Sequence, residues 1–135
     1  MEIAIKVYIS GSYTEQKRLR EESHKLFALG HCITSTWLNE VQQPSYLTKE
    51  QWYASLAVKD LAEVSAADCF ILDLVGVSTT GGRFVEFGYA LGRHSMLILL
   101  VGGSDLGVFD TLANESMKDW GEVVEYFTED ADGNK

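Results

Sequence analysis

The chain of 135 residues contains one proline, two cysteines and no long hydrophobic run. Cys32 and Cys69 each lie in an apolar segment, without the spacing of a zinc site or a disulfide framework, so we expect reduced cysteines and a cytoplasmic protein. The start of the chain also lacks the basic segment and cleavage site of a secretory signal. The apolar run from Met96 to Val101 is far too short to cross a bilayer, so we expect no membrane association.

Positive charge is scarce as well. Eleven Lys and Arg residues stand against 20 Asp and Glu residues, which gives a formal net charge of -9. Long nucleic acids are held mainly by basic side chains that neutralise phosphates, so DNA or RNA is not an expected partner. A small anion such as a nucleotide is compatible with this charge, because helix N-termini and loop N–H groups bind a single phosphate locally.

Several familiar functional motifs are missing. Residues 76–81 have the glycine spacing of a P-loop, but Gly82 and Arg83 stand where the lysine and the Ser or Thr are required. No GxGxxG follows the first predicted strand, and no GxSxG elbow occurs. The three histidines are scattered, and no cluster of His, Asp and Glu predicts a metal. We therefore predict neither a cofactor nor a metal site.

Apolar segments alternate with amphipathic ones along the chain. We predict buried strands over Ile3–Ile9, Cys32–Trp37, Ala67–Val75 and Met96–Val101, and a short fifth strand around Val123–Tyr126. We predict a first helix over Thr14–Leu29 and a second helix that begins at a capping box formed by Thr48 and Gln51. We predict a third helix over Gly82–Gly92 and a further helix or turn over Phe109–Trp120. The second of these helices has an expected buried stripe at Ala54, Ala57, Val58, Leu61, Val64 and Ser65, with Asp60 at its edge.

This alternation predicts an α/β protein, a flavodoxin-like or Rossmann-like three-layer sandwich. The near-continuous apolar strands favour a five-stranded parallel sheet in the order 2-1-3-4-5, with helices on both faces. We expect a single domain over residues 1–127 and a disordered acidic tail over residues 128–135.

In this strand order the loops that follow strands 1 and 3 form one crevice at the topological switch point. Both loops are rich in glycine and hydroxyl groups, which bind sugar or phosphate oxygens. The predicted substrate-binding residues here are Ser10, Gly11, Ser12, Ser78, Thr80, Gly81 and Gly82. Turn chemistry and helix capping explain any one of them equally well, so the prediction depends on their joint placement. Candidates for stacking on a base are Tyr13, Trp37, Trp52 and Tyr53, although a core or interface position would explain each of them equally well.

Three carboxylates accompany these loops. Glu86 lies in the first turns of the helix that opens on Gly81 and Gly82, and its neighbours are apolar, which is rare for an acid unless it is paired or used. The alternative explanation is that the helix dipole favours an acid near a helix N-terminus. Asp73 ends an apolar strand and is a second candidate, with loop capping as its alternative role. Carboxylates in one crevice suit glycosyl transfer: one attacks the anomeric carbon while a second acid protonates the leaving group. We expect the helix N-terminus to lower the pKa of Glu86.

Four segments, in this order, resemble the nucleoside 2-deoxyribosyltransferase family, and they cover roughly residues 4–101. The segments are Lys6–Gly11, Thr34–Leu38, Asp60–Asp68 and Gly81–Ala90, whose Glu-Phe-Gly-Tyr-Ala block is the most specific. The resemblance implies that Glu86 is a nucleophile that forms a covalent deoxyribosyl intermediate. It also implies that Tyr8 orients Glu86, and that Asp60 assists protonation of the leaving base. By the same resemblance, the partners are a deoxynucleoside or deoxynucleotide and a free base, and the protein is a homo-oligomer, a dimer or larger.

Residues 76–82 depart from this family, because they contain hydroxyls and no acid where a second aspartate often lies. The loop is similar to that of related deoxynucleoside-monophosphate N-glycosidases, whereas residues 10–13 are less rich in glycine and arginine than theirs. We therefore expect deoxyribosyl transfer between bases, with hydrolysis of a 5′-monophosphate as an alternative. Two further alternatives are an NAD or ADP-ribose glycosidase and a non-catalytic nucleotide-binding protein.

Overall fold

The computed structural model describes residues 3–40, 42–76, 81–93, 95–103 and 107–132. Its strands are β1 (Lys6–Ser10), β2 (Cys32–Ile33), β3 (Cys69–Asp73), β4 (Leu97–Val101) and β5 (Glu115–Met117). Its α-helices are α1 (Gln16–Ala28), α2 (Lys49–Ser65), α3 (Gly82–Leu91) and α4 (Trp120–Asp132). The described residues also form the short 3-10 helices η1 (Tyr13–Glu15), η2 (Thr36–Asn39) and η3 (Val108–Leu112). Within these ranges, no helix is long and apolar enough to cross a membrane.

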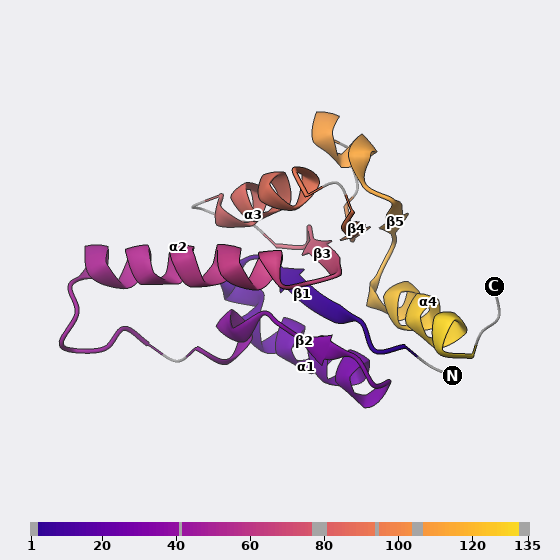
Figure 1. Ribbon diagram of the computed structural model, residues 1–135, viewed down its shortest axis with the longest axis horizontal. Helices are drawn as coiled ribbons and strands as arrows, with labels where there is room; N and C mark the ends of the chain where they lie inside the picture. Colours follow the sequence, from indigo (N-terminus) through magenta and orange to yellow (C-terminus); the bar gives the residue numbers. More distant parts are fainter. Residues whose placement is uncertain (1–2, 41, 77–80, 94, 104–106, 133–135) are drawn as a thin grey trace.

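The strands form one parallel sheet in the order β2-β1-β3-β4-β5, which confirms the predicted topology. Helices α2 and α3 lie on one side of the sheet, and α1 and α4 lie on the other (Figure 1). The central strands are therefore covered on both faces. This explains why β3 and β4 are apolar at nearly every position rather than at alternate ones.

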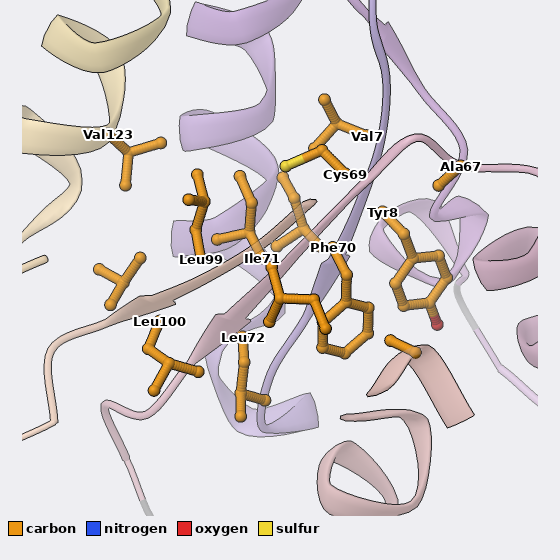
Figure 2. Packing of buried hydrophobic residues seen from close by; sticks show 14 of the residues in the cluster. Val7, Tyr8, Ala67, Cys69, Phe70, Ile71, Leu72, Leu99, Leu100 and Val123 are labelled. Atoms are coloured by element: carbon orange, nitrogen blue, oxygen red, sulfur yellow. The ribbon is translucent and has the colours of Figure 1, made fainter. Parts of the chain in front are cut away.

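The core is built around these central strands. Phe70, Ile71 and Leu72 of β3 are fully buried, as are Leu99 and Leu100 of β4, and their side chains lie close together in Figure 2. In the register between β1 and β3, Tyr8 pairs with Phe70 and Ser10 pairs with Leu72. Because side chains alternate along a strand, Tyr8 and Ser10 point to the same face of the sheet.

The C-terminal part of the chain differs from the prediction. Residues 123–126, predicted as a strand, lie inside α4, and the fifth strand is β5. Val123 and Phe127 are both fully buried, and their separation of four residues is that of one helix face. Only Met117 of β5 is buried, so that strand has no apolar run to reveal it. Helix α4 also continues through residues 128–132, where we expected a disordered tail.

Helix α2 begins as predicted but is covered less than predicted. The Thr48 side chain accepts a hydrogen bond from the Gln51 N–H at 3.1 Å, and the Gln51 side chain accepts one from the Thr48 N–H at 2.9 Å. Of the expected buried stripe, only Val64 is buried, and Val58 is 72% exposed. The rest of the stripe is not buried because the N-terminal half of α2 extends beyond the sheet (Figure 1). This face of α2 is therefore left open by the described part of the chain.

Candidate active site

The predicted nucleophile Glu86 lies on the side of α3 that faces the sheet. Gly81 precedes the helix in the left-handed conformation, with φ of 73°, which glycine adopts at little cost. Arg83, Phe87 and Ala90 form the buried face of α3, and Glu86 lies one turn after Arg83 on that side. Its carboxylate accepts two hydrogen bonds: Tyr8 Oη donates to Oε2 at 3.1 Å, and Ser10 Oγ donates to Oε1 at 2.6 Å.

Both donors come from β1 and are held rigidly. Tyr8 and Ser10 have no exposed surface. The Tyr8 ring stacks on Phe70 with 5.9 Å between the ring centroids, and Phe70 stacks on Phe87 at 6.3 Å. The strand and this ring stack together fix where the two hydroxyls lie. Ser10, which we predicted to bind substrate, instead contacts the candidate nucleophile.

Asp60 reaches the same site from α2. A cleft with a volume of about 170 Å³ is lined by Gly11, Tyr13, Trp37, Glu40, Leu56, Asp60, Gly82, Arg83 and Glu86. Among the described residues, Asp60 Oδ1 has no hydrogen-bond partner, and Lys59 Nζ lies 3.7 Å from it. The cleft therefore brings together two carboxyl groups, one held by hydroxyls and the other with an unbonded oxygen.

The surroundings of Asp60, Glu86 and Tyr8 shift the pKa of each group for different reasons. Burial, and then the charge of Glu86, raises the pKa of Asp60 to about 7. Burial also raises the pKa of Glu86, and the hydrogen bonds from Ser10 and Tyr8 oppose that rise. The expectation that the helix N-terminus would lower the pKa of Glu86 is therefore wrong, because desolvation dominates. Burial, with the charges of Glu86 and Asp60, raises the pKa of Tyr8, so its hydroxyl stays protonated and donates.

Three of the other predicted binding residues line the cleft, namely Gly11, Trp37 and Gly82. Trp37 donates its indole N–H to Ile9 O at 2.7 Å, which leaves its ring beside Tyr13 at 6.1 Å between centroids. Gly11 is needed for close packing, since a Cβ there would lie 2.5 Å from Leu19 Cδ1.

The remaining predicted binding residues do not line the cleft. Ser12 is buried, and its hydroxyl lies 2.8 Å from the Thr14 hydroxyl. Gly81 sets the start of α3 without lining the cleft. Ser78 and Thr80 were also predicted to bind substrate, and they lie outside the described residues.

Asp73 has the contacts of the structural role that the sequence left open as its alternative. It is fully buried at the end of β3 and is not part of the cleft lining. Arg18 donates to both of its oxygens, at 2.9 and 3.2 Å, and Trp120 Nε1 donates at 2.7 Å. The Val75 N–H adds a fourth bond at 3.0 Å. These contacts tie α1, β3 and α4 together, so Asp73 stabilises the fold instead of meeting substrate.

Sequence reasoning missed three residues that line the cleft, Glu40, Leu56 and Arg83. Glu40 follows η2 and forms an ion pair with Lys59. Its position after β2, at the same carboxyl edge of the sheet, was the signal that would have found it. Arg83 was visible in the glycine motif, but its guanidinium donates to backbone carbonyls of residues 73, 75 and 76, so it holds the loop after β3.

No protein-family model and no curated protein sequence matches this chain. Among solved structures, a 2-deoxyribosyltransferase from Bacillus psychrosaccharolyticus matches with a TM-score of 0.74 and 18% identity over 90% of this chain and 91% of that chain. The two proteins share one fold. A conserved protein from Enterococcus faecalis V583 matches with a TM-score of 0.67 and 14% identity over 94% and 99% of the two chains. A CMP N-glycosidase from Clostridium botulinum matches with a TM-score of 0.53 and 18% identity over 91% and 97%.

At these identities the likeness establishes the fold, and it agrees with the flavodoxin-like arrangement that the sequence predicts. A fold alone does not fix the chemistry of a site. The residues that line the cleft decide which chemistry this fold supports here.

Proposed function

We propose that this protein is an enzyme that cleaves the N-glycosidic bond of a 2′-deoxynucleoside or its 5′-monophosphate and transfers the deoxyribosyl group to another base. One observation carries the proposal. Glu86 has both oxygens held by neutral hydroxyls and shares a cleft with Asp60, whose pKa is raised to about 7. The names of two proteins with this fold, a 2-deoxyribosyltransferase and a CMP N-glycosidase, support the choice of bond.

The first half-reaction uses the two carboxyl groups in different protonation states. An oxygen of ionised Glu86 attacks C1′ of the sugar while the C1′–N bond breaks and leaves its electron pair on the base. Protonated Asp60 gives its proton to the departing base nitrogen. The products are a deoxyribosyl ester on Glu86, a neutral base and an ionised Asp60. The Tyr8 hydroxyl stays protonated throughout and continues to donate to Glu86.

The second half-reaction reverses these steps with a new acceptor. A nitrogen of a second base attacks C1′, the bond from C1′ to the Glu86 oxygen breaks, and Asp60 takes up the proton that the acceptor nitrogen loses. When water is the acceptor, the same steps release the free sugar or its 5-phosphate. Hydrolysis is therefore the alternative outcome of one site, and the acceptor decides between the two.

The test is to incubate the purified protein with each 2′-deoxynucleoside and each 5′-monophosphate, with and without a second base, and to separate the products by chromatography. A new nucleoside supports transfer, and a free base formed without an acceptor supports the N-glycosidase alternative. A parallel incubation with NAD tests for nicotinamide release. Protein carrying Glu86→Gln is the matched control. Absence of base release from every substrate would contradict the proposal.

We also propose that the enzyme acts as a homo-oligomer, a dimer or larger. Helices α2 and α3 carry exposed apolar side chains, among them Val58 and Val85 at 72% and 65% exposure. On the side of α3 away from Glu86, a groove of about 1010 Å³ runs between α3 and η3 and is bordered by Phe84, Phe109 and Leu112. A second copy that covers these surfaces would remove them from water. Sedimentation velocity tests this proposal. We expect a dimer or larger species for the native protein, and we expect a Val85→Glu variant to dissociate. A monomeric native protein would contradict the proposal.

We place the activity in the cytoplasm. Both cysteines are free, and Cys32 is exposed, which fits a reducing compartment. The proposed steps call on carboxyl and hydroxyl groups of the chain itself and on no metal or cofactor.

A further inference from the structure

Ser10 is the closer of the two hydrogen-bond donors to Glu86. Its hydroxyl lies 2.6 Å from Oε1, whereas the Tyr8 hydroxyl lies 3.1 Å from Oε2. A separation of 2.5–2.7 Å is typical of a hydroxyl that donates to an ionised carboxylate. Ser10 also has no exposed surface and does not line the cleft, so its hydroxyl points to Glu86 and not to a ligand.

The position of Ser10 limits how its hydroxyl moves. It is the last residue of β1 and pairs with Leu72 of β3, so its backbone is held by the sheet. Its side chain has a single rotatable bond to the hydroxyl-bearing atom, which leaves few alternative positions. Tyr8, two residues earlier on the same face, is fixed by its stack on Phe70. A carboxylate bonded at one oxygen is free to turn about its last side-chain bond, whereas one bonded at both oxygens is not.

We propose that Ser10 is a positioning residue that, together with Tyr8, holds the Glu86 carboxylate in one orientation with a free lone pair directed into the cleft. This inference rests on the proposed role of Glu86 as the nucleophile. Each carboxylate oxygen has two acceptor sites, so the bonds from Ser10 and Tyr8 leave a site on each oxygen for attack. The alternative, in which Ser10 binds substrate, would require its hydroxyl to leave Glu86.

The hydrogen bonds from Ser10 and Tyr8 stabilise the charged form of Glu86 in a cleft where other carboxylates lie nearby. The other titratable groups near Glu86 are Tyr8 on β1, Tyr13 on η1, Glu40 after η2, Lys59, Asp60 and Glu63 on α2, and Arg83 on α3. Among the described residues, neither cation forms an ion pair with Glu86: Lys59 pairs with Glu40, and Arg83 bonds to backbone carbonyls. Hydroxyl donors therefore supply the stabilisation of the charged form, and of the two, the Ser10 bond lowers the pKa of Glu86 more.

The direct test is a titration of the Glu86 carboxyl by NMR on protein labelled with ¹³C in glutamate side chains, with the signal assigned through Glu86→Gln. We expect Ser10→Ala to raise the pKa of Glu86 by about one unit, because a donor to the charged form is lost. Ser10→Cys, which is close in size but a weaker donor, should give a smaller rise. Ser23→Ala is the control, since Ser23 is also buried but donates to Arg20 O on α1. An unchanged pKa in both Ser10 variants would overturn the inference.

Kinetics separate a positioning role from substrate binding. We expect Ser10→Ala to lower kcat about tenfold with little change in KM, and to move the acid limb of the pH profile upward. Ser10→Thr, which keeps the hydroxyl, should recover most of the loss. A rise in KM without movement of the acid limb would assign Ser10 to substrate and contradict the inference. The titration needs no turnover, so an inactive native protein would refute the proposed function while the role of Ser10 is still decided by the titration.

Discussion

Two acidic side chains near the carboxyl edge of the central strands, Asp73 and Glu86, differ in what surrounds them. Asp73 is fully buried and accepts four hydrogen bonds, two of them from the cation Arg18. Glu86 is half-buried, accepts two bonds from neutral hydroxyls and lines a cleft. Both carboxylates are removed from much of the solvent, and only one of them is neutralised by a neighbouring charge.

This difference separates an architectural carboxylate from the one that we propose to be reactive. The guanidinium of Arg18 offsets the charge of Asp73, and Trp120 connects it to α4, so the network has no group left to react with a ligand. The charge of Glu86 is stabilised but not cancelled, so it remains available for attack on an electrophilic carbon. The partners of a buried carboxylate, rather than its burial, therefore indicate its role.

The largest effect is expected at Glu86. Glu86→Gln keeps the size of the side chain and removes the charge, so we expect kcat/KM for base release to fall by about 10⁴-fold or more. The free energy of unfolding should stay the same or rise at neutral pH, because burial disfavours the charged form of Glu86 in the folded protein. Product chromatography and urea denaturation measure the two quantities. Activity within tenfold of the native protein would remove Glu86 from the nucleophile role.

Asp73→Ala should lower the free energy of unfolding and leave the activity of the folded protein nearly unchanged. Removing this carboxylate leaves the buried Trp120 N–H and the Val75 N–H without this acceptor, whereas the partly exposed Arg18 keeps its ion pair with Glu15. We expect the free energy of unfolding to fall by about 1–3 kcal/mol. Turnover per folded molecule should stay within a few-fold of the native value. Denaturation curves, with activity corrected for the folded fraction, test both statements. Full stability combined with lost activity would place Asp73 in the site and end the contrast with Glu86.

Asp60→Asn should act mainly on the basic side of the pH profile. In the native protein we expect activity to decline above pH of about 7, as Asp60 loses the proton that it gives to the base, and to decline at low pH, as Glu86 becomes protonated. The variant should lose about 10²-fold in kcat and should no longer show the decline at high pH. Steady-state rates between pH 5 and 9 test this. A basic limb that persists in the variant would assign that limb to another group.

The smallest effect is expected for Tyr8→Phe, which keeps the ring stack on Phe70 and removes only the longer bond to Glu86. Activity should fall several-fold, and the acid limb should move upward by less than in Ser10→Ala. The melting temperature should change little, because the aromatic packing is retained. A larger kinetic loss in Tyr8→Phe than in Ser10→Ala would reverse the ranking of the two donors.

The sequence was sufficient for the sheet order, because the central strands are continuous apolar runs separated by helix signals such as the Thr48 capping box. It was not sufficient for β5, where Met117 alone is buried and β-prone residues of α4 gave a competing signal. Glu86 was predicted as a candidate through its motif, and it lines the cleft. The contacts of Ser10 and Asp73 could not be predicted, because the bonds from Ser10 to Glu86 and from Trp120 to Asp73 join residues 76 and 47 positions apart. Such bonds depend on strand register and helix packing, which local patterns do not encode.

The central claim is that Glu86 forms a covalent bond to the sugar, and trapping that bond tests it most directly. The protein is mixed with a reactive 2′-deoxynucleoside, denatured in acid within a fraction of a second, digested and analysed by mass spectrometry. The account predicts that the peptide containing Glu86 gains the mass of one deoxyribosyl group, and that Glu86→Gln protein shows no gain. Base release without any adduct on this peptide, or an adduct that persists in Glu86→Gln, would contradict it.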